Sequence, residues 1–166
     1  MNTSLLDPNL DQVARPLGHL VAEFNFLELD TARLIASLLD EGDEVAAVFT
    51  ATLSYSDKLM LIQRLTHVKI QDSALRDQID AALAAARRVN TDRNRYVHAE
   101  FLPVVAGDDE LIATLTRRLR ARPNEQAQPT NDQEIAAIAN SANAVAMQMR
   151  VIAARLEDWR HDGECR

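Results

Sequence analysis

Apolar residues recur at alternating spacings of three and four along most of the chain, which is the period of helices with one buried face. In the first long stretch the series runs Leu17, Leu20, Phe24, Leu27, Leu34 and Leu38, with Thr31 filling the gap. On the other side of that stretch fall Glu23, Asp30, Arg33 and Ser37. We expect this helix to begin at Asp7-Pro8 or to restart near Pro16, because proline suits the first helical turn and costs a hydrogen bond farther in.

The last long stretch has the most regular period in the chain. Its apolar positions are Ile135, Ile138, Ala142, Val145, Met149, Ile152, Leu156 and Trp159. These alternating steps of three and four match the seam of a coiled coil. Two interpretations fit: a core-facing helix of a bundle, or a seam between two copies of the chain.

Capping signals divide the middle of the chain into shorter helices. After a short helix over 44–53, the capping box at 54–57 opens a helix whose inward residues are Leu59, Ile62, Leu65 and Val68. Asp72-Ser73 caps the next helix, which runs through His98, with a break at Asn90-Thr91 as an alternative. Its buried face is Leu75, Ile79, Ala82, Ala86 and Val89. A second capping box at 130–133 opens the last helix.

Residues 101–119 differ from the rest. The run 101–105 is apolar and contains a proline, Gly107-Asp108-Asp109 is a turn signal, and threonines follow in 111–118. We therefore predict a small β-hairpin here, inserted in an all-α bundle of about five helices that forms one domain over 1–166.

Composition narrows the class of protein. Only 4 glycines and 5 prolines punctuate 166 residues, which favours long helices over an all-β fold. The single cysteine, Cys165, excludes an intrachain disulfide and a multi-cysteine zinc site. No signal-like or membrane-spanning stretch is evident, so we expect a cytoplasmic protein that does not enter membranes. The histidines His19, His67, His98 and His161 share no ligand spacing. We therefore expect neither a metal nor a cofactor.

The segment Arg93-Asn94-Arg95-Tyr96-Val97-His98 carries the candidate chemistry. A histidine transfers protons near neutral pH, and an arginine stabilises charge on phosphate oxygens. These side chains suit metal-free cleavage of RNA, whose 2′-hydroxyl supplies the nucleophile. On a straight helix Asn94 and His98 lie about 40° apart, whereas Arg93 lies about 140° from His98. A second subunit, an irregular helix or the reach of the arginine would have to complete the site.

Structural explanations stand beside this one. Arg93 could pair with Glu28, and His98 could cap or fill the end of its helix. Glu28 lies near the edge of an apolar face, where it forms a salt bridge or orients Arg93 or His98. Tyr96 either stacks on a base or packs into the core, and Arg95 belongs to the basic residues that would contact RNA.

The order arginine, asparagine, then histidine late in a long helix resembles the HEPN superfamily of all-α domains. The resemblance covers most of the chain in layout and six residues in motif. It implies a homodimer with a shared cleft and metal-independent endoribonuclease activity, often in toxin–antitoxin or phage-defence systems, with an antitoxin or other protein as a further partner. Arg93 and His98 would then be catalytic and Asn94 supporting. One branch carries a tyrosine two residues after the histidine; here that position is Glu100.

The charge is divided between two parts of the chain. The net charge of −7 argues against a general nucleic-acid binder. Residues 84–122, however, hold eight arginines and five acidic residues, so the acidic excess lies elsewhere. We expect a local basic cleft on an acidic body.

The alternative to an endoribonuclease is a non-catalytic helical module that binds a protein partner or a nucleotide.

Overall fold

A computed structural model describes residues 8–106, 110–117, 128–129 and 132–161 of the chain. Within these ranges the helices are α1 (Pro8–Leu39), α2 (Asp43–Thr50), α3 (Tyr55–Lys69), α4 (Ser73–Val97) and α5 (Asp132–His161). The strands are β1 (Ala99–Ala106), β2 (Glu110–Arg117) and β3 (Gln128–Pro129). This confirms the predicted helical bundle with an inserted hairpin. Thr130 and Asn131, predicted as part of a cap, lie outside the described residues, as do Arg118, Arg120, Arg122 and Cys165.

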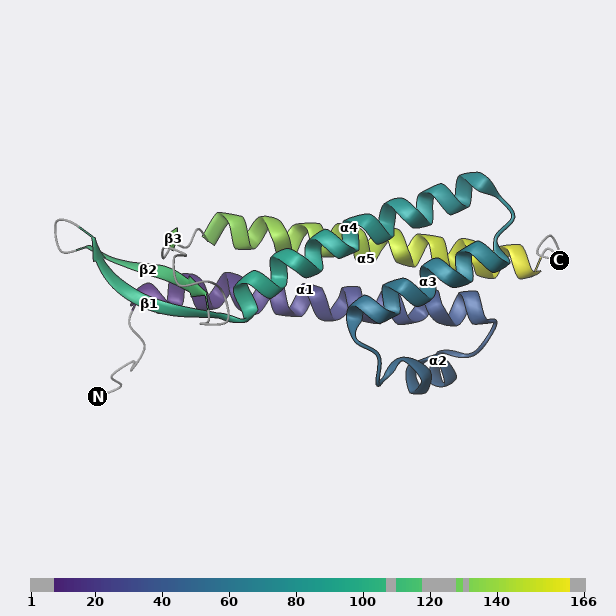
Figure 1. Ribbon diagram of the computed structural model, residues 1–166, viewed down its shortest axis with the longest axis horizontal. Helices are drawn as coiled ribbons and strands as arrows, with labels where there is room; N and C mark the ends of the chain where they lie inside the picture. The colour runs from purple at the N-terminus through teal and green to yellow at the C-terminus, as the bar shows by residue number, and fades with distance from the viewer. Residues whose placement is uncertain (1–7, 107–109, 118–127, 130–131, 162–166) are drawn as a thin grey trace.

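Helices α1 and α5 run side by side in the same direction and form the most extensive contact of the bundle (Figure 1). Three polar pairs join them, each between residues 120 positions apart: Glu23 with Asn143, Asp30 with Arg150, and Ser37 with Glu157. The pairs recur every seven residues along both helices. Because seven residues make two turns, one face of each helix stays against the other.

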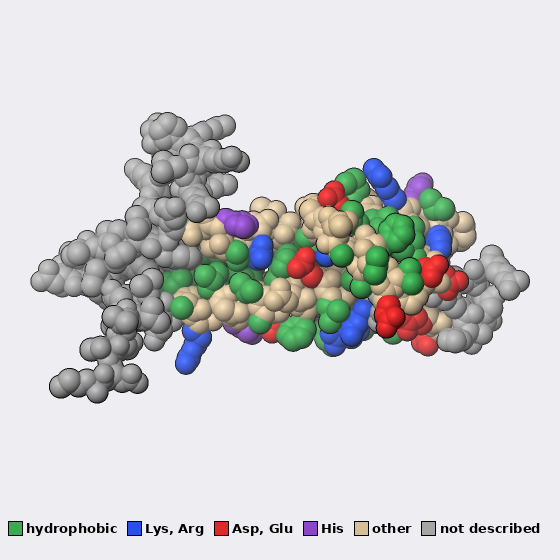
Figure 2. Space-filling view, turned by 90° about the horizontal axis from the view of Figure 1, so that it is seen from below, with side chains coloured by type: hydrophobic (Ala, Val, Ile, Leu, Met, Phe, Trp, Pro, Cys, Tyr) green, Lys and Arg blue, Asp and Glu red, His purple; other side chains and the backbone are tan. Residues whose placement is uncertain are grey.

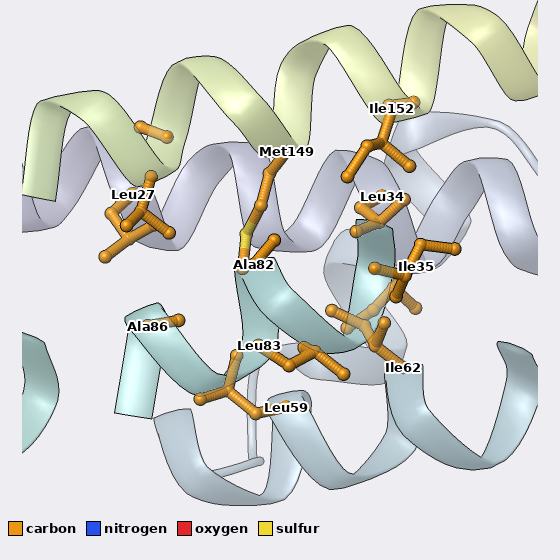
Figure 3. Close-up of a cluster of buried hydrophobic side chains, with 14 of the residues drawn as sticks. Leu27, Leu34, Ile35, Leu59, Ile62, Ala82, Leu83, Ala86, Met149 and Ile152 are labelled. Carbon is orange, nitrogen blue, oxygen red and sulfur yellow. The ribbon is translucent and has the colours of Figure 1, made fainter. Parts of the chain in front are cut away.

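The apolar positions of α5 are therefore covered by other helices of the same chain. Among its members, Ile135, Ala142 and Met149 are fully buried. Met149 reaches from α5 toward Ala82 of α4 (Figure 3), and the Thr31 hydroxyl lies 3.2 Å from its sulfur. Of the two interpretations of this period, the core-facing helix is the one observed. The side chain of Trp159 lies outside the described residues.

Helix α3 continues the layer beside α1, and α4 returns antiparallel across both (Figure 1). The predicted caps hold: the Asp57 amide donates to the Ser54 hydroxyl oxygen at 3.2 Å, and the Ala74 and Leu75 amides donate to Asp72. Helix α4 continues through Asn90 without the alternative break. All five residues predicted for its buried face are buried. The main core thus lies between α1, α3, α4 and α5 (Figure 3).

The strands extend the end of the bundle where α4 finishes. β1 pairs antiparallel with β2, placing Ala99 opposite Arg117 and Ala106 opposite Glu110, and β3 adds to the other side of β2. Pro103 lies on β1, an outer strand, where a missing amide hydrogen is tolerated. Beneath this end a second apolar cluster contains Val13, Leu20 and Tyr96.

Three residues were assigned to the wrong face of their helices. Asp30 and Ser37, placed on the outer side of α1, are buried at 0% and 4% exposure because α5 covers that side. Val68, predicted to point inward, is 74% exposed. The buried column of α3 passes from Ile62 to Thr66, and Val68 follows Thr66 by about 200° of helix rotation. Of the two predicted starts of the first helix, the one at Asp7-Pro8 is observed: α1 begins at Pro8, and Pro16 lies inside it.

Candidate functional site

A polar cleft of about 270 Å³ lies where α1, the start of α3 and the second half of α4 meet. It is lined by Phe24, Glu28, Ser54, Tyr55, Ser56, Asn90, Arg93 and Asn94. Two of the three predicted catalytic residues, Arg93 and Asn94, are therefore brought together here. They reach the cleft because the buried face of α4 packs on the core and turns the adjacent face toward α1 and α3.

The Arg93 guanidinium is held from two directions. Its central carbon lies 4.7 Å from the centre of the Phe24 ring, and one terminal nitrogen donates to the Asn94 side-chain oxygen at 3.0 Å. Stacking on an aromatic face and a hydrogen bond together restrict the rotation of this long side chain. Phe24 is itself fixed by an edge contact with Tyr55 at 4.9 Å. The Arg93 Nε is buried and has no hydrogen-bond partner among the described residues.

Amides extend this arrangement along α4. The Asn94 side-chain nitrogen donates to the Asn90 side-chain oxygen at 3.5 Å, so Asn90, Asn94 and Arg93 form one connected row. Across the cleft, Ser54 caps the start of α3, where the first backbone amides of the helix lie. The positive end of a helix and a nearby guanidinium both favour an anion.

Glu28 has a different partner from the one considered in the sequence. Its carboxylate pairs with the Lys58 ammonium at 3.5 Å, while Arg93 is engaged by Asn94 and Phe24. The Lys58 side chain is 14% exposed and that of Glu28 is 37% exposed, so the pair is partly buried. Glu28 lines the cleft, whereas Lys58 is not among the lining residues. Glu28 therefore brings a carboxylate into the same cleft as Arg93.

His98 is separated from the other two predicted catalytic residues. It is the C-cap of α4, its backbone amide donates to the Asn94 carbonyl at 3.3 Å, and its side chain is exposed. The residues that line the cleft do not include it. Within one chain, Arg93 and Asn94 line the cleft. The His98 side chain lies one helical turn farther along and is exposed to solvent instead.

Arg95 and Tyr96 face α5 instead of the cleft. The Arg95 guanidinium pairs with Glu134 at 3.3 Å and lies 5.5 Å from the Tyr96 ring centre. Tyr96 is 1% exposed, so packing is the alternative observed and the base-stacking role is wrong. Burial, followed by the hydrogen bond with Glu134, raises the pKa of Tyr96 to about 12.

Sequence reasoning missed several residues of the cleft. Phe24 has the spacing of a core residue, and it is buried, yet its ring also supports Arg93. Asn90 carries the signal of a helix break, and Ser54 that of a cap. No local pattern connects Lys58 with Glu28, because they belong to different helices.

Within the described ranges, no three His, Cys, Asp or Glu side chains gather as a metal site. No helix in those ranges is long and apolar enough to cross a bilayer. In comparisons with known proteins, no family model, no curated protein and no solved structure matches the chain.

Proposed function

We propose that the protein is a metal-independent endoribonuclease of the HEPN type that works as a homodimer. The observation that carries the proposal is the fixed Arg93 guanidinium, held on Phe24 and by Asn94 in a cleft that also contains the start of α3. A phosphate of RNA fits this arrangement because it can accept from both the guanidinium and the helix amides.

The reaction follows from the residue types. His98 takes the proton of the 2′-hydroxyl, the 2′-oxygen attacks phosphorus, and the bond to the 5′-oxygen breaks as that oxygen takes a proton from water. The protonated His98 then returns its proton to solvent. The products are a 2′,3′-cyclic phosphate and a 5′-hydroxyl end. Arg93 stabilises the charge on the non-bridging oxygens, and Asn94 holds Arg93 in place. No step needs a metal ion.

The position of His98 supports a second copy in the proposed site. Because this side chain is exposed and outside the lining of its own cleft, we place it against the Arg93 cleft of the partner chain. A toxin or a phage-defence effector is the cellular role that fits such an activity, with an antitoxin as a partner that blocks the cleft.

The same observation about His98 favours one other function. A cleft with a positioned arginine and no histidine in its lining can bind a phosphate group without cleaving RNA. The chain would then be a non-catalytic helical module that binds a nucleotide or a phosphorylated partner.

Cleavage of a mixed RNA pool in EDTA separates the two functions. Wild type should produce cyclic phosphate ends, and Arg93→Ala or His98→Ala should each slow cleavage by at least about a hundredfold. Arg15→Ala, at an exposed arginine of α1 outside residues 84–122, is the control and should leave the rate unchanged. Cleavage that persists in His98→Ala contradicts the proposal. Binding without cleavage by wild type establishes the non-catalytic module.

Mixing the two inactive variants tests the shared site. If Arg93 of one chain works with His98 of the other, a mixed dimer contains one complete site and recovers cleavage. If both residues act within one chain, the mixture stays inactive, which contradicts the shared cleft.

A further inference from the structure

Helix α2 displays an apolar surface toward solvent. Val45, Val48 and Phe49 are 48%, 77% and 67% exposed, and they lie three and four positions apart on one side of the helix. The opposite side packs inward through Ala46 and Thr50. Single exposed apolar residues are ordinary, whereas a cluster on one short helix marks an interaction surface. We call Val45, Val48 and Phe49 the α2 ridge.

Acidic side chains border the ridge. Glu41 precedes α2 and Glu44 lies in its first turn, and both are exposed. Figure 2 looks onto the face that carries α2, and its right-hand part shows hydrophobic side chains with both acidic and basic ones beside them. The α2 ridge is therefore an apolar surface with two exposed acidic residues next to it in the sequence.

A groove of about 470 Å³ between α3 and α4 has the opposite character. It is lined by Met60, Gln63, Arg64, Thr66, His67, Val68, Arg76 and Asp80. Met60 and Val68 are 42% and 74% exposed and supply apolar surface. Arg64 and Arg76 outnumber Asp80, the one acidic residue of the lining, so the groove carries a net positive charge.

We propose that the α2 ridge of one copy docks into the α3–α4 groove of a second copy, and that the contact is reciprocal. The apolar and charged features of the two surfaces are complementary in the same molecule. Both surfaces lie toward the same end of the bundle, where α2 packs on α1 (Figure 1). A two-fold axis can therefore satisfy both at once and close the assembly as a dimer.

The contact would border the Arg93 cleft, because Ser54 of that cleft follows α2 by only a few residues. The proposal concerns the contact surface alone and does not depend on RNA cleavage. A dimer that forms through this surface and never cleaves RNA would contradict only the proposed function.

The mass of the full chain in solution, measured by light scattering after size exclusion, tests the ridge. Wild type should be a dimer, and Phe49→Asp should be a monomer with an unchanged helical circular dichroism spectrum. Val151→Asp is the matched control, since Val151 is a 63% exposed apolar residue of α5, and it should remain a dimer. A monomeric wild type, or a dimer lost in Val151→Asp and kept in Phe49→Asp, overturns the proposal.

Charge reversal tests the pairing of ridge and groove. Glu44→Arg and Arg64→Glu should each weaken the dimer by about tenfold, because each places like charges opposite one another. When the two variants are mixed, both contacts of the reciprocal dimer again join opposite charges, and mixed dimers should form with the wild-type affinity. Failure of the mixture to associate contradicts the proposal even if each single variant is a monomer.

Discussion

The Asp30 carboxylate, fully buried between α1 and α5, accepts two hydrogen bonds from the Arg150 guanidinium, at 2.8 and 3.2 Å. Arg33 donates a third at 3.0 Å from the next turn of α1. The Arg150 side chain is 48% exposed, so the pair joins a buried anion to a cation that reaches the surface. The hydrogen bond to Asp30 raises the pKa of the Arg150 guanidinium.

Removing the cation should harm the fold more than removing the anion. Arg150→Ala leaves a buried carboxylate with Arg33 as its remaining cation, whereas Asp30→Ala leaves two arginines that can turn to water. We expect Asp30→Ala to cost about 1–3 kcal/mol of unfolding free energy in urea. Arg150→Ala should cost more, and adding Asp30→Ala to it should restore part of the loss.

The third polar pair along the same helices is the control. The Ser37 hydroxyl donates to Glu157 at 3.1 Å, and Glu157 is exposed. Glu157→Ala should therefore cost less than about 1 kcal/mol. Equal costs for Glu157→Ala and Arg150→Ala would show that burial of Asp30 does not govern this contact.

The sequence predicts where the helices lie along the chain, but it does not predict which residues of different helices contact one another. The three-four period locates α1 and α5 because burial of one helix face is a local property of the sequence. Asp30 and Ser37 were misplaced because their partners, Arg150 and Glu157, lie 120 residues away. A buried acid can be recognised only when the residue that compensates its charge is known.

In the candidate site, too, the local relationships are predicted from the sequence and the contacts between helices are not. The local motif places Arg93 beside Asn94, and the structure joins them by a hydrogen bond. Phe24, which supports the guanidinium, comes from another helix and carries only a core signal in the sequence. His98 follows Asn94 by one turn, yet the helix ends there, so its side chain meets solvent rather than the cleft.

Thr31 replaces an apolar residue in the seam between α1 and α5, and its hydroxyl should matter more than its size. The hydroxyl donates to the Leu27 carbonyl at 2.7 Å and lies 3.3 Å from the Tyr55 hydroxyl. Thr31→Val keeps the shape but leaves the buried Tyr55 hydroxyl without this partner. We expect a loss of about 1–2 kcal/mol in urea unfolding. A gain in stability would mean that the seam prefers an apolar residue here.

Tyr96 should make the protein lose stability in alkali. Its folded pKa of about 12 exceeds the ordinary value of 10.0, chiefly through burial. The stabilising contribution is complete below pH 10 and is lost as the pH rises toward 12, because the unfolded chain ionises first. Urea midpoints should fall over this window in wild type and fall less in Tyr96→Phe.

Tyrosine absorbance supplies the check. The chain has 2 tyrosines, and burial raises the pKa of Tyr55 as well. Neither should ionise near pH 10 while the protein is folded, and Glu134→Gln should lower the titration midpoint of Tyr96. A folded wild type in which a tyrosine titrates at pH 10 would refute this assignment.

Glu28 tests whether the Arg93 cleft receives a phosphate. Its carboxylate lines the same cleft and pairs with Lys58. It therefore repels a phosphate in the cleft, and it engages the Lys58 ammonium, which could otherwise attract that phosphate. Glu28→Gln removes the negative charge and frees Lys58, and we expect RNA to bind about two- to fivefold more tightly at low salt. Asp92→Asn, on the exposed side of α4, is the control for a general change of charge. If Glu28 instead orients Arg93 or His98, Glu28→Gln slows cleavage without tightening RNA binding. If Glu28→Gln and Asp92→Asn tighten RNA binding equally, RNA does not bind in this cleft.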